Sequence, residues 1–383
     1  MTPVYLDNNG TTPVDPAVLK AMLPFLQNEF GNPSSNTALG QRAHDAIETA
    51  RAQVAALIGA EPNEITFTSG GTESSNVVIR GAVRLDRNRR AIVTTNIEHP
   101  ATEACVAYLQ TQGHQVTRVA SKADGLVDAA AMAAAIDANT ALVTVIHAQN
   151  EIGTLQPVAA IAAAARKHGA LTHIDAAQSV GKIPIDVKAL GVDFLSIAGH
   201  KLYAPKGVGV LYARRGVTLP PLLLGAGQEH GRRPGTENVP YIVGLGEACR
   251  VAGSMIAREQ PRLSALAATL LATLKRDIPG LVLTGDAEQR LPNTLNVLFP
   301  GVSGRRLLEI CPQVLASNGS ACHADSEEPS TILTALGIPR DQALGAVRLS
   351  LGRFTTADDI TIAASALTTA WRLLSAAPMA KAV

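Results

Sequence analysis

A lysine directly follows an apolar stretch of the chain, at a place where an amine can do covalent chemistry. The run 193–198 is typical of a buried strand, and it leads through Gly199 and His200 to Lys201. A lysine at a strand end is usually an exposed side chain. An amine held in a pocket is different, because desolvation lowers its pKa and lets it bond covalently to a carbonyl group. Residues elsewhere in the sequence distinguish an exposed lysine from one held in a pocket.

Two other segments place a chemical group at the end of an apolar run. Thr72 follows a Gly-Gly pair after the predicted strand 65–68 and opens a predicted helix. Free N–H groups at a helix start bind anions such as phosphate, although a threonine there can also be a simple helix cap. Asp175 ends the run 171–174, and a buried carboxylate needs a cationic partner. Taken alone, Asp175 is also explained as a helix cap.

The three groups together indicate one cofactor. A phosphate site, a carboxylate and a lysine on one sheet edge match pyridoxal 5′-phosphate (PLP), whose ring nitrogen pairs with a carboxylate and whose aldehyde bonds to a lysine. His99 and Asn150 also follow predicted strands, so we expect them at the same edge. A nicotinamide site is disfavoured, because no G-x-G-x-x-G motif follows the first strand.

One of the four cysteines differs from the others in its surroundings. Cys322 lies among small residues in the stretch 316–326, which suits an exposed nucleophile that must move. We expect Cys105, Cys249 and Cys311 to be buried structural residues. No second cysteine or histidine stands at ligand spacing from Cys322, so no metal site is expected.

Composition excludes several classes of protein. The 383 residues are 46% hydrophobic and 17% charged, with a formal net charge of +1. This balance argues against a broad binding surface for nucleic acid or an anionic membrane. No apolar run is long enough to span a membrane, and the N-terminus shows no secretory signal, so we expect a cytoplasmic protein with reduced thiols.

The hydrophobic pattern predicts an α/β fold with two domains. Strands at 65–68, 91–95, 115–119, 141–147, 171–174, 194–197 and 208–212 alternate with helices at 16–30, 36–59, from 72, from 100, 129–136 and 157–168. This alternation predicts a mostly parallel sheet flanked by helices. Helices at 240–258 and 261–276 lead into shorter strands at 282–284, 294–299 and 348–351, with helices near 303–310, 331–336 and 357–375. We therefore expect a large domain of residues 16–239, and a smaller α+β domain of 1–15 and 240–383 that carries a mobile cysteine loop at about 316–330.

The motifs in combination resemble a known family. They are FTSGGTES (67–74), EH (98–99), NEIG (150–153), HIDAAQS (173–179), GHK (199–201), RPGTEN (233–238), GSAC (319–322), EPS (328–330) and RLSLGRFTT (348–356). The chain resembles the cysteine desulfurases of the NifS/IscS type and the related selenocysteine lyases, which are class V aminotransferase-family enzymes with PLP fold type I. The likeness spans nearly the whole chain.

The resemblance implies a role for each matching residue. Lys201 would bind PLP covalently, and Asp175 would pair with the ring nitrogen. Gln178 would hydrogen-bond the ring hydroxyl, and His99 would stack on the ring. The phosphate would be held by Gly71, Thr72 and His200, together with Thr236 of a second subunit. Asn150 and Arg348 would bind the substrate carboxylate, and Cys322 would accept sulfur. Two positions depart from the family pattern: Ala198 stands where many desulfurases have serine, and Gly10 stands where alanine is usual.

The implied reaction converts L-cysteine to L-alanine, with sulfur transferred to Cys322 as a persulfide and then to an acceptor protein or a small thiol. The resemblance also implies a homodimer. A selenocysteine lyase acting on L-selenocysteine is the alternative. A non-catalytic PLP-fold protein is a more distant one, and the presence of Lys201, Asp175 and Cys322 speaks against it.

Overall fold

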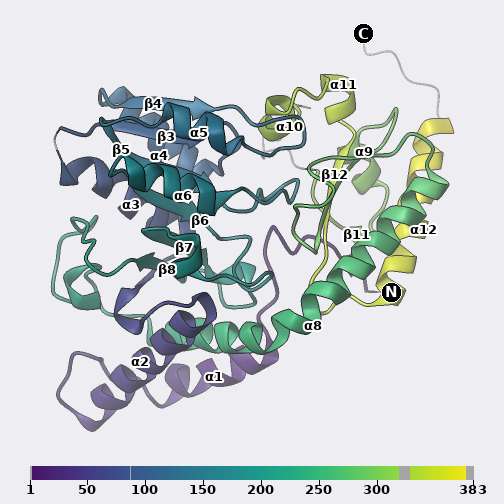
Figure 1. Ribbon diagram of the computed structural model, residues 1–383. Helices are drawn as coiled ribbons and strands as arrows, with labels where there is room; N and C mark the ends of the chain where they lie inside the picture. The colour runs from purple at the N-terminus through teal and green to yellow at the C-terminus, as the bar shows by residue number, and fades with distance from the viewer. Residues whose placement is uncertain (1, 87, 319–327, 377–383) are drawn as a thin grey trace.

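The computed structural model describes residues 2–86, 88–318 and 328–376. Figure 1 shows a large lobe built around a central sheet and a smaller lobe that holds the C-terminal elements. The predicted α/β fold with a mostly parallel sheet is confirmed. No helix in the described part of the chain is both long enough and apolar enough to cross a membrane.

The central sheet has seven strands in the order β2-β8-β7-β6-β5-β3-β4. Their bounds are β2 Ile65–Thr68, β3 Ala91–Thr95, β4 Gln115–Val119, β5 Thr140–Ile146, β6 Leu171–Asp175, β7 Phe194–Ala198 and β8 Gly209–Ala213. Strand β8 runs antiparallel to both β2 and β7, and the other neighbouring strands are parallel. The carboxyl ends of β3, β5, β6 and β7 therefore meet at one edge, as parallel pairing requires.

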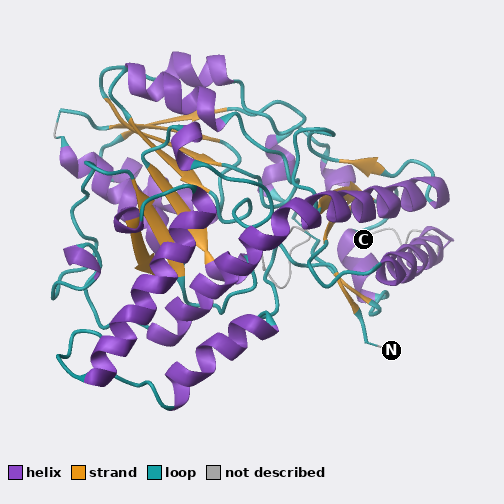
Figure 2. Ribbon diagram, turned by 60° about the horizontal axis from the view of Figure 1, so that its bottom comes forward, coloured by secondary structure: helices purple, strands orange, loops and turns teal. Residues whose placement is uncertain are grey.

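Helices cover both faces of this sheet (Figure 2). They are α1 Pro16–Gln27, α2 Ala38–Ile58, α3 Gly71–Leu85, α4 Pro100–Thr111, α5 Ala129–Ala135, α6 Val158–Lys167 and α7 Val187–Leu190, with 3₁₀ turns at Pro62–Glu64, Gly199–Lys201 and Glu229–Gly231. Alternate residues of strand β8 pack on opposite faces of the sheet. Val210 and Tyr212 pack in the apolar cluster that includes α2, whereas Leu211 and Ala213 pack in the cluster of α3 and α4. Burial on both faces explains why these strands are continuously apolar.

The small lobe contains a three-stranded sheet and a two-stranded one. Its elements are β9 Val282–Leu283, β10 Thr294–Leu298, α9 Gly304–Glu309, β11 Val314–Leu315, α10 Thr331–Ala335, α11 Arg340–Ala343, β12 Ala346–Ser350 and α12 Ala357–Ala376. Strand β1, Val4–Tyr5, pairs with β11. Val4 and Leu6 share one apolar cluster with the small lobe, which supports grouping the N-terminal segment with that lobe as we propose.

The prediction of two helices at 240–258 and 261–276 is wrong. A single helix, α8, extends over Val239–Asp277 and contains Pro261. Proline removes one helical hydrogen bond, and because this destabilises a helix, a break in the helix is expected before Pro261. Burial on both sides offsets this destabilisation: the residues before Pro261 pack against α1 and α2, and those after it pack against α12. Figure 1 shows α8 running from the large lobe into the small one.

Candidate functional site

A pocket lies where the carboxyl edge of the sheet faces the small lobe. Its volume is about 370 Å³, within the range of about 300–1,000 Å³ typical of small-molecule sites. Its lining contains the predicted site residues Gly71, Thr72, His99, Asn150, Asp175, Gln178, His200, Lys201 and Arg348. A larger cavity of about 470 Å³ lies beside the N-terminal segment and Phe354, but it contains none of these residues. The first pocket is therefore the candidate site.

The N-terminus of α3 forms the anion-binding side of the pocket. Helix α3 begins after Gly70, whose φ of 154° is a conformation that favours glycine. Strand β8 passes so close that a Cβ on Gly209 would lie 2.5 Å from the Cα of Gly70. This tight approach places Thr72 and the free N–H groups of the first turn at the pocket. His200 is nearby, with its Nδ1 3.1 Å from the Thr11 hydroxyl.

Asp175 supplies a buried carboxylate at the end of β6. Its Oδ1 accepts a hydrogen bond from the N–H of Ala177 at 3.0 Å, and within the described part of the chain no side-chain cation is bonded to it. Burial raises the pKa of Asp175, while the His99 ring, the N–H of Ala177 and the charge of Lys201 oppose this increase. A bound cation would stabilise the charged form. The arrangement therefore fits a ligand that brings a protonated nitrogen into the pocket.

His99 is held as a neutral imidazole at the start of α4. Its Nδ1 accepts the N–H of Ala101 at 3.1 Å as the helix cap. Burial lowers the pKa of His99, the charge of Lys201 lowers it further, and that of Asp175 opposes both. A ring with Nδ1 as acceptor carries its proton on Nε2. His99 therefore presents one N–H group, without a positive charge, to the pocket.

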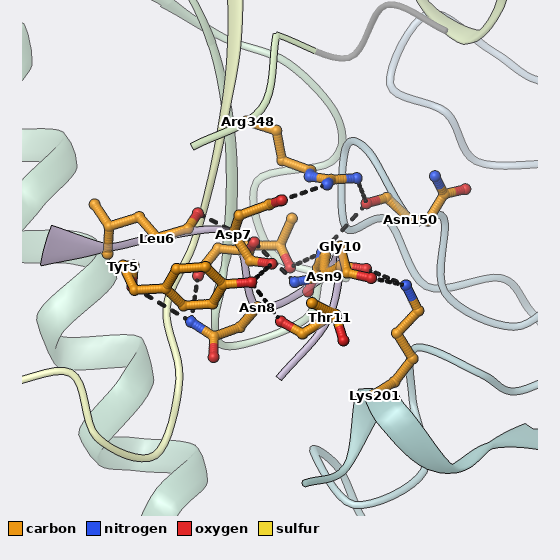
Figure 3. A network of polar contacts seen from close by, with 12 residues as sticks. Tyr5, Leu6, Asp7, Asn8, Asn9, Gly10, Thr11, Asn150, Lys201 and Arg348 are labelled. Atoms are coloured by element: carbon orange, nitrogen blue, oxygen red, sulfur yellow. Dashed lines mark hydrogen bonds and ion pairs between the residues drawn. The ribbon is translucent and has the colours of Figure 1, made fainter. Parts of the chain in front are cut away.

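Lys201 points from the 3₁₀ turn after β7 toward the N-terminal segment (Figure 3). Its Nζ donates to the carbonyl oxygens of Asn9 at 2.6 Å and Gly10 at 2.5 Å. Burial, together with the charge of Arg348, lowers the pKa of Lys201 to about 8. A larger fraction of the amine is therefore neutral near pH 7 than for an ordinary lysine, and neutral amines are nucleophiles and bases.

Arg348 enters the pocket from β12 in the small lobe. Its Nη1 donates to the carbonyl oxygen of Asn150 at 3.1 Å, and its Nη2 donates to Oδ1 of Asp7 at 2.7 Å (Figure 3). The Arg348 side chain is only 9% exposed. A buried guanidinium facing a pocket is suited to carboxylate binding.

Sequence reasoning missed two polar residues that fix the position of Gln178. Lys182 donates to Oε1 of Gln178 at 2.7 Å and to Oδ1 of Asn9 at 2.9 Å, while Nε2 of Gln178 donates to the carbonyl oxygen of Asn9 at 2.9 Å. Burial lowers the pKa of Lys182 well below its ordinary value. One signal was available: Lys182 follows Gln178 by four residues. Nothing in the sequence indicated the contact with Asn9.

Glu98 is a third residue that the sequence did not single out. Its Oε1 accepts the Thr95 hydroxyl at 2.6 Å and the N–H of Ile146 at 3.0 Å. Burial raises the pKa of Glu98 to about 8. The side chain is therefore largely uncharged near neutral pH, so it does not add a second negative charge beside Asp175.

One predicted site residue in the described part of the chain, Thr236, does not line the pocket. Thr236 is exposed, on a loop outside the pocket lining. That loop is fixed to the large lobe because Glu229 forms a buried ion pair with Arg51 at 2.8 Å, and Arg233 pairs with Glu73 in the first turn of α3. Thr236 therefore lies outside the lining of the pocket of its own chain.

Cys322 lies outside the described residues. The described residues on either side of it, however, adjoin the pocket. The backbone of Ser317 bonds to that of Arg348, and the Ser330 hydroxyl donates to Oε2 of Glu151 at 2.6 Å. Both flanks of the cysteine segment are thus attached to residues that line the pocket or adjoin it.

Comparison with known proteins gives consistent matches. The family model for aminotransferase class-V matches residues 4–362. A cysteine desulfurase of Trichormus azollae is 46% identical over 358 residues, 93% of this chain and 90% of the relative. One of Mus musculus is 44% identical over 364 residues, 94% of this chain and 79% of the relative.

Solved structures agree in fold over nearly the full length. A structure described as a NifS-like protein superposes with a TM-score of 0.90 at 36% identity, covering 98% of this chain and 100% of the other. One described as SspA in complex with cysteine has a TM-score of 0.81 at 37% identity, covering 92% of this chain and 99% of the other. Together with the match over residues 4–362, this shows that the chain belongs to the aminotransferase class-V family.

Proposed function

We propose that this chain is a PLP-dependent cysteine desulfurase. The observation that carries the proposal is the pocket that places Lys201, Asp175 and Arg348 at the N-terminus of α3. The relatives named cysteine desulfurase, at 43–47% identity over most of the chain, support it. So does the similar structure described as a complex with cysteine.

The residues of the pocket fit PLP by their chemistry. Asp175 is a buried carboxylate without a cationic hydrogen-bond partner in the described chain, which suits a protonated ring nitrogen. Thr72, the first turn of α3 and His200 would hold the phosphate, and Gln178, fixed by Lys182, would bond the ring hydroxyl. When bound, the cofactor would supply a sink for the electron pair released from the substrate carbon.

Each remaining task falls to a residue of the chain. Arg348 and Asn150 would hold the substrate carboxylate, and this orients the α-carbon toward Lys201. Lys201, with a pKa of about 8, can accept a proton and return it near neutral pH. His99 would offer an uncharged N–H group to the pocket.

We further propose that Cys322 takes the sulfur. L-cysteine and the Cys322 thiol give L-alanine and a Cys322 persulfide: the carbon–sulfur bond breaks, a sulfur–sulfur bond forms, and the thiol proton ends on alanine. The balance needs no outside oxidant. An acceptor protein or small thiol would then remove the sulfur.

A homodimer is part of this proposal. Helix α1 exposes an apolar stripe, with Leu19 at 49%, Leu23 at 40% and Leu26 at 54%, and such a stripe is typical of an interaction surface. The exposed position of Thr236 is consistent with a contact to the pocket of a second subunit.

The test compares Lys201→Ala and Cys322→Ala with the native chain and a Cys105→Ala control. Purified proteins receive L-cysteine and L-selenocysteine in parallel, and alanine is measured. We expect Lys201→Ala to lose turnover, and Cys322→Ala to bind PLP but lose sulfur release from cysteine. Unchanged sulfide release by Cys322→Ala would exclude the nucleophile role, and a strong preference for L-selenocysteine would favour the lyase alternative.

A further inference from the structure

Asp7 and Arg348 form an ion pair at the wall of the pocket. The Nη2–Oδ1 distance is 2.7 Å, and the two side chains are 29% and 9% exposed. Because the arginine end is nearly closed to solvent, water screens this pair less than it screens a surface pair. The guanidinium that would bind substrate therefore already has an anionic partner within its own chain.

The Nε–H group of Arg348 has no hydrogen-bond partner in the described part of the chain. Nη1 is bonded to the carbonyl oxygen of Asn150 and Nη2 to Asp7, whereas the buried Nε has no partner in the described part of the chain. A carboxylate binds a guanidinium best through two adjacent N–H groups. Nη2 already donates to Asp7, so a substrate carboxylate that binds this guanidinium would lie close to the negative charge of Asp7.

Gly10 leaves the space that the Asp7 carboxylate occupies. A Cβ on Gly10 would lie 2.4 Å from Oδ2 and 2.8 Å from Cγ of Asp7. The turn cannot easily move away, because the N–H groups of Gly10 and Thr11 both donate to the Asp7 carbonyl oxygen, at 2.9 and 3.2 Å. Gly10 does not have a positive φ, so an alanine there would strain the Asp7 carboxylate rather than the backbone.

We propose that Asp7 is a resident counter-ion that competes with the substrate carboxylate for Arg348, and that Gly10 permits this competition. The inference rests on the proposed role of Arg348 in carboxylate binding. Asp7 in this sense limits affinity: its charge weakens the binding of a carboxylate at Arg348. Figure 3 shows the Asp7 carboxylate directed toward the Arg348 side chain, beside the turn whose carbonyl oxygens accept hydrogen bonds from the Lys201 amine.

The experiment measures binding to the PLP-loaded protein by calorimetry rather than by turnover. The probe is 3-mercaptopropionate, which has the carboxylate and thiol of cysteine but no amine. Asp7→Asn keeps the shape and the hydrogen bond but removes the charge, and we expect Kd to fall about tenfold, the size of a charge interaction near a partly buried site. Gly10→Ala should lower Kd in the same direction, and the double variant should add little, because both changes remove one interaction.

Cysteamine, which has the amine and thiol but no carboxylate, is the matched control, and its affinity should not respond to Asp7→Asn. Unchanged or weaker binding of 3-mercaptopropionate by both single variants would overturn the proposal. Arg348→Ala separates this failure from that of the proposed function. If it weakens 3-mercaptopropionate while the Asp7 and Gly10 variants do nothing, only the counter-ion idea fails. If it has no effect, the carboxylate site lies elsewhere and both proposals fail.

Discussion

The protonation of Lys201 can be tested on the side chain alone. Burial and the charge of Arg348 lower its pKa to about 8 from an ordinary value of 10.5. Only the neutral amine reacts with an acylating reagent, so pulse labelling of the cofactor-free protein with acetic anhydride should increase as pH rises through about 8. Mass spectrometry of the Lys201 peptide gives the midpoint. A midpoint near 10.5 would contradict the pocket environment described for Lys201.

Ala198 predicts a second measurable effect. Its methyl group lies 3.5 Å from the position of a Cβ on Gly71, beside the first turn of α3, so a hydroxyl there would adjoin the anion-binding helix end. We expect Ala198→Ser to tighten PLP binding by about tenfold, the value of one hydrogen bond to a charged group. Equilibrium titration of cofactor-free protein with PLP measures it. Ala198→Val adds bulk without a hydrogen-bond donor and should give no gain in PLP affinity. Equal affinity of the Ala198→Ser variant and the native protein would refute the contact.

For single residues, the sequence predicted the site residues that follow strands and missed the residues that hold these side chains in position. Lys201 and Asp175 could be placed because each follows an apolar run, and parallel strands end at one edge. Asp7 and Lys182 act through contacts with Arg348 and Asn9. These partners are more than 170 residues away in the sequence, and no periodicity encodes such a contact.

Among the elements, α8 shows why a local rule failed. Proline is unfavourable inside a helix by about 3 kcal/mol or more, and sequence reasoning therefore placed a break before Pro261. Leu263, Ala267 and Leu270 bury the second half of α8 in the small lobe, whereas Leu245 and Cys249 bury the first half in the large one. Packing of both halves of α8 outweighs the free-energy cost of Pro261. This packing depends on the tertiary fold and not on the sequence of the helix alone.

The loop that carries Thr236 is anchored to the large lobe by a buried ion pair, besides the pair of Arg233 with Glu73. Arg51 of α2 and Glu229 are 4% and 2% exposed, and Glu229 also accepts the N–H of Phe67 in β2 at 2.8 Å. Glu229→Gln would leave the buried Arg51 guanidinium with only the more exposed Glu48 as its anionic partner, so the free energy of unfolding should fall by about 3 kcal/mol. Urea unfolding measures this change.

The matched control is Glu29→Gln, which breaks the more exposed pair with Arg42. Its effect should stay below about 1 kcal/mol, as for other surface pairs. A Glu229→Gln variant as stable as this control would show that the loop is held by other contacts.

Across the whole molecule, the N-terminal turn joins the two lobes at the pocket. Asn9 donates to the Thr294 hydroxyl in the small lobe at 2.8 Å, and its carbonyl oxygen accepts from Lys201 in the large lobe. The apolar core is also shared, since Leu298 and Ile332 pack in one cluster with Val143 of the central sheet. The pocket is thus built from both lobes, and a sequence read segment by segment predicts the lobes but not their junction.

The assembly itself can be tested by mixing subunits. In a dimer where Thr236 serves the pocket of its partner, one Lys201→Ala chain paired with one Thr236→Ala chain has one pocket with both defects and one with neither. If Thr236 served its own pocket, every pocket of the mixed dimer would carry one defect. We therefore expect differently tagged, co-purified mixed dimers to bind one PLP per dimer with native affinity, measured by titration.

Homodimers of each variant are the controls: Thr236→Ala should bind PLP about tenfold more weakly at both sites, from the loss of one hydrogen bond to a charged group, and Lys201→Ala should form no covalent bond to it. Loss of the native-affinity site in the mixed dimer would place Thr236 within its own chain's site. That result would conflict with its exposed position outside the pocket lining, and would require the loop at 225–238 to move although Glu229 anchors it to Arg51.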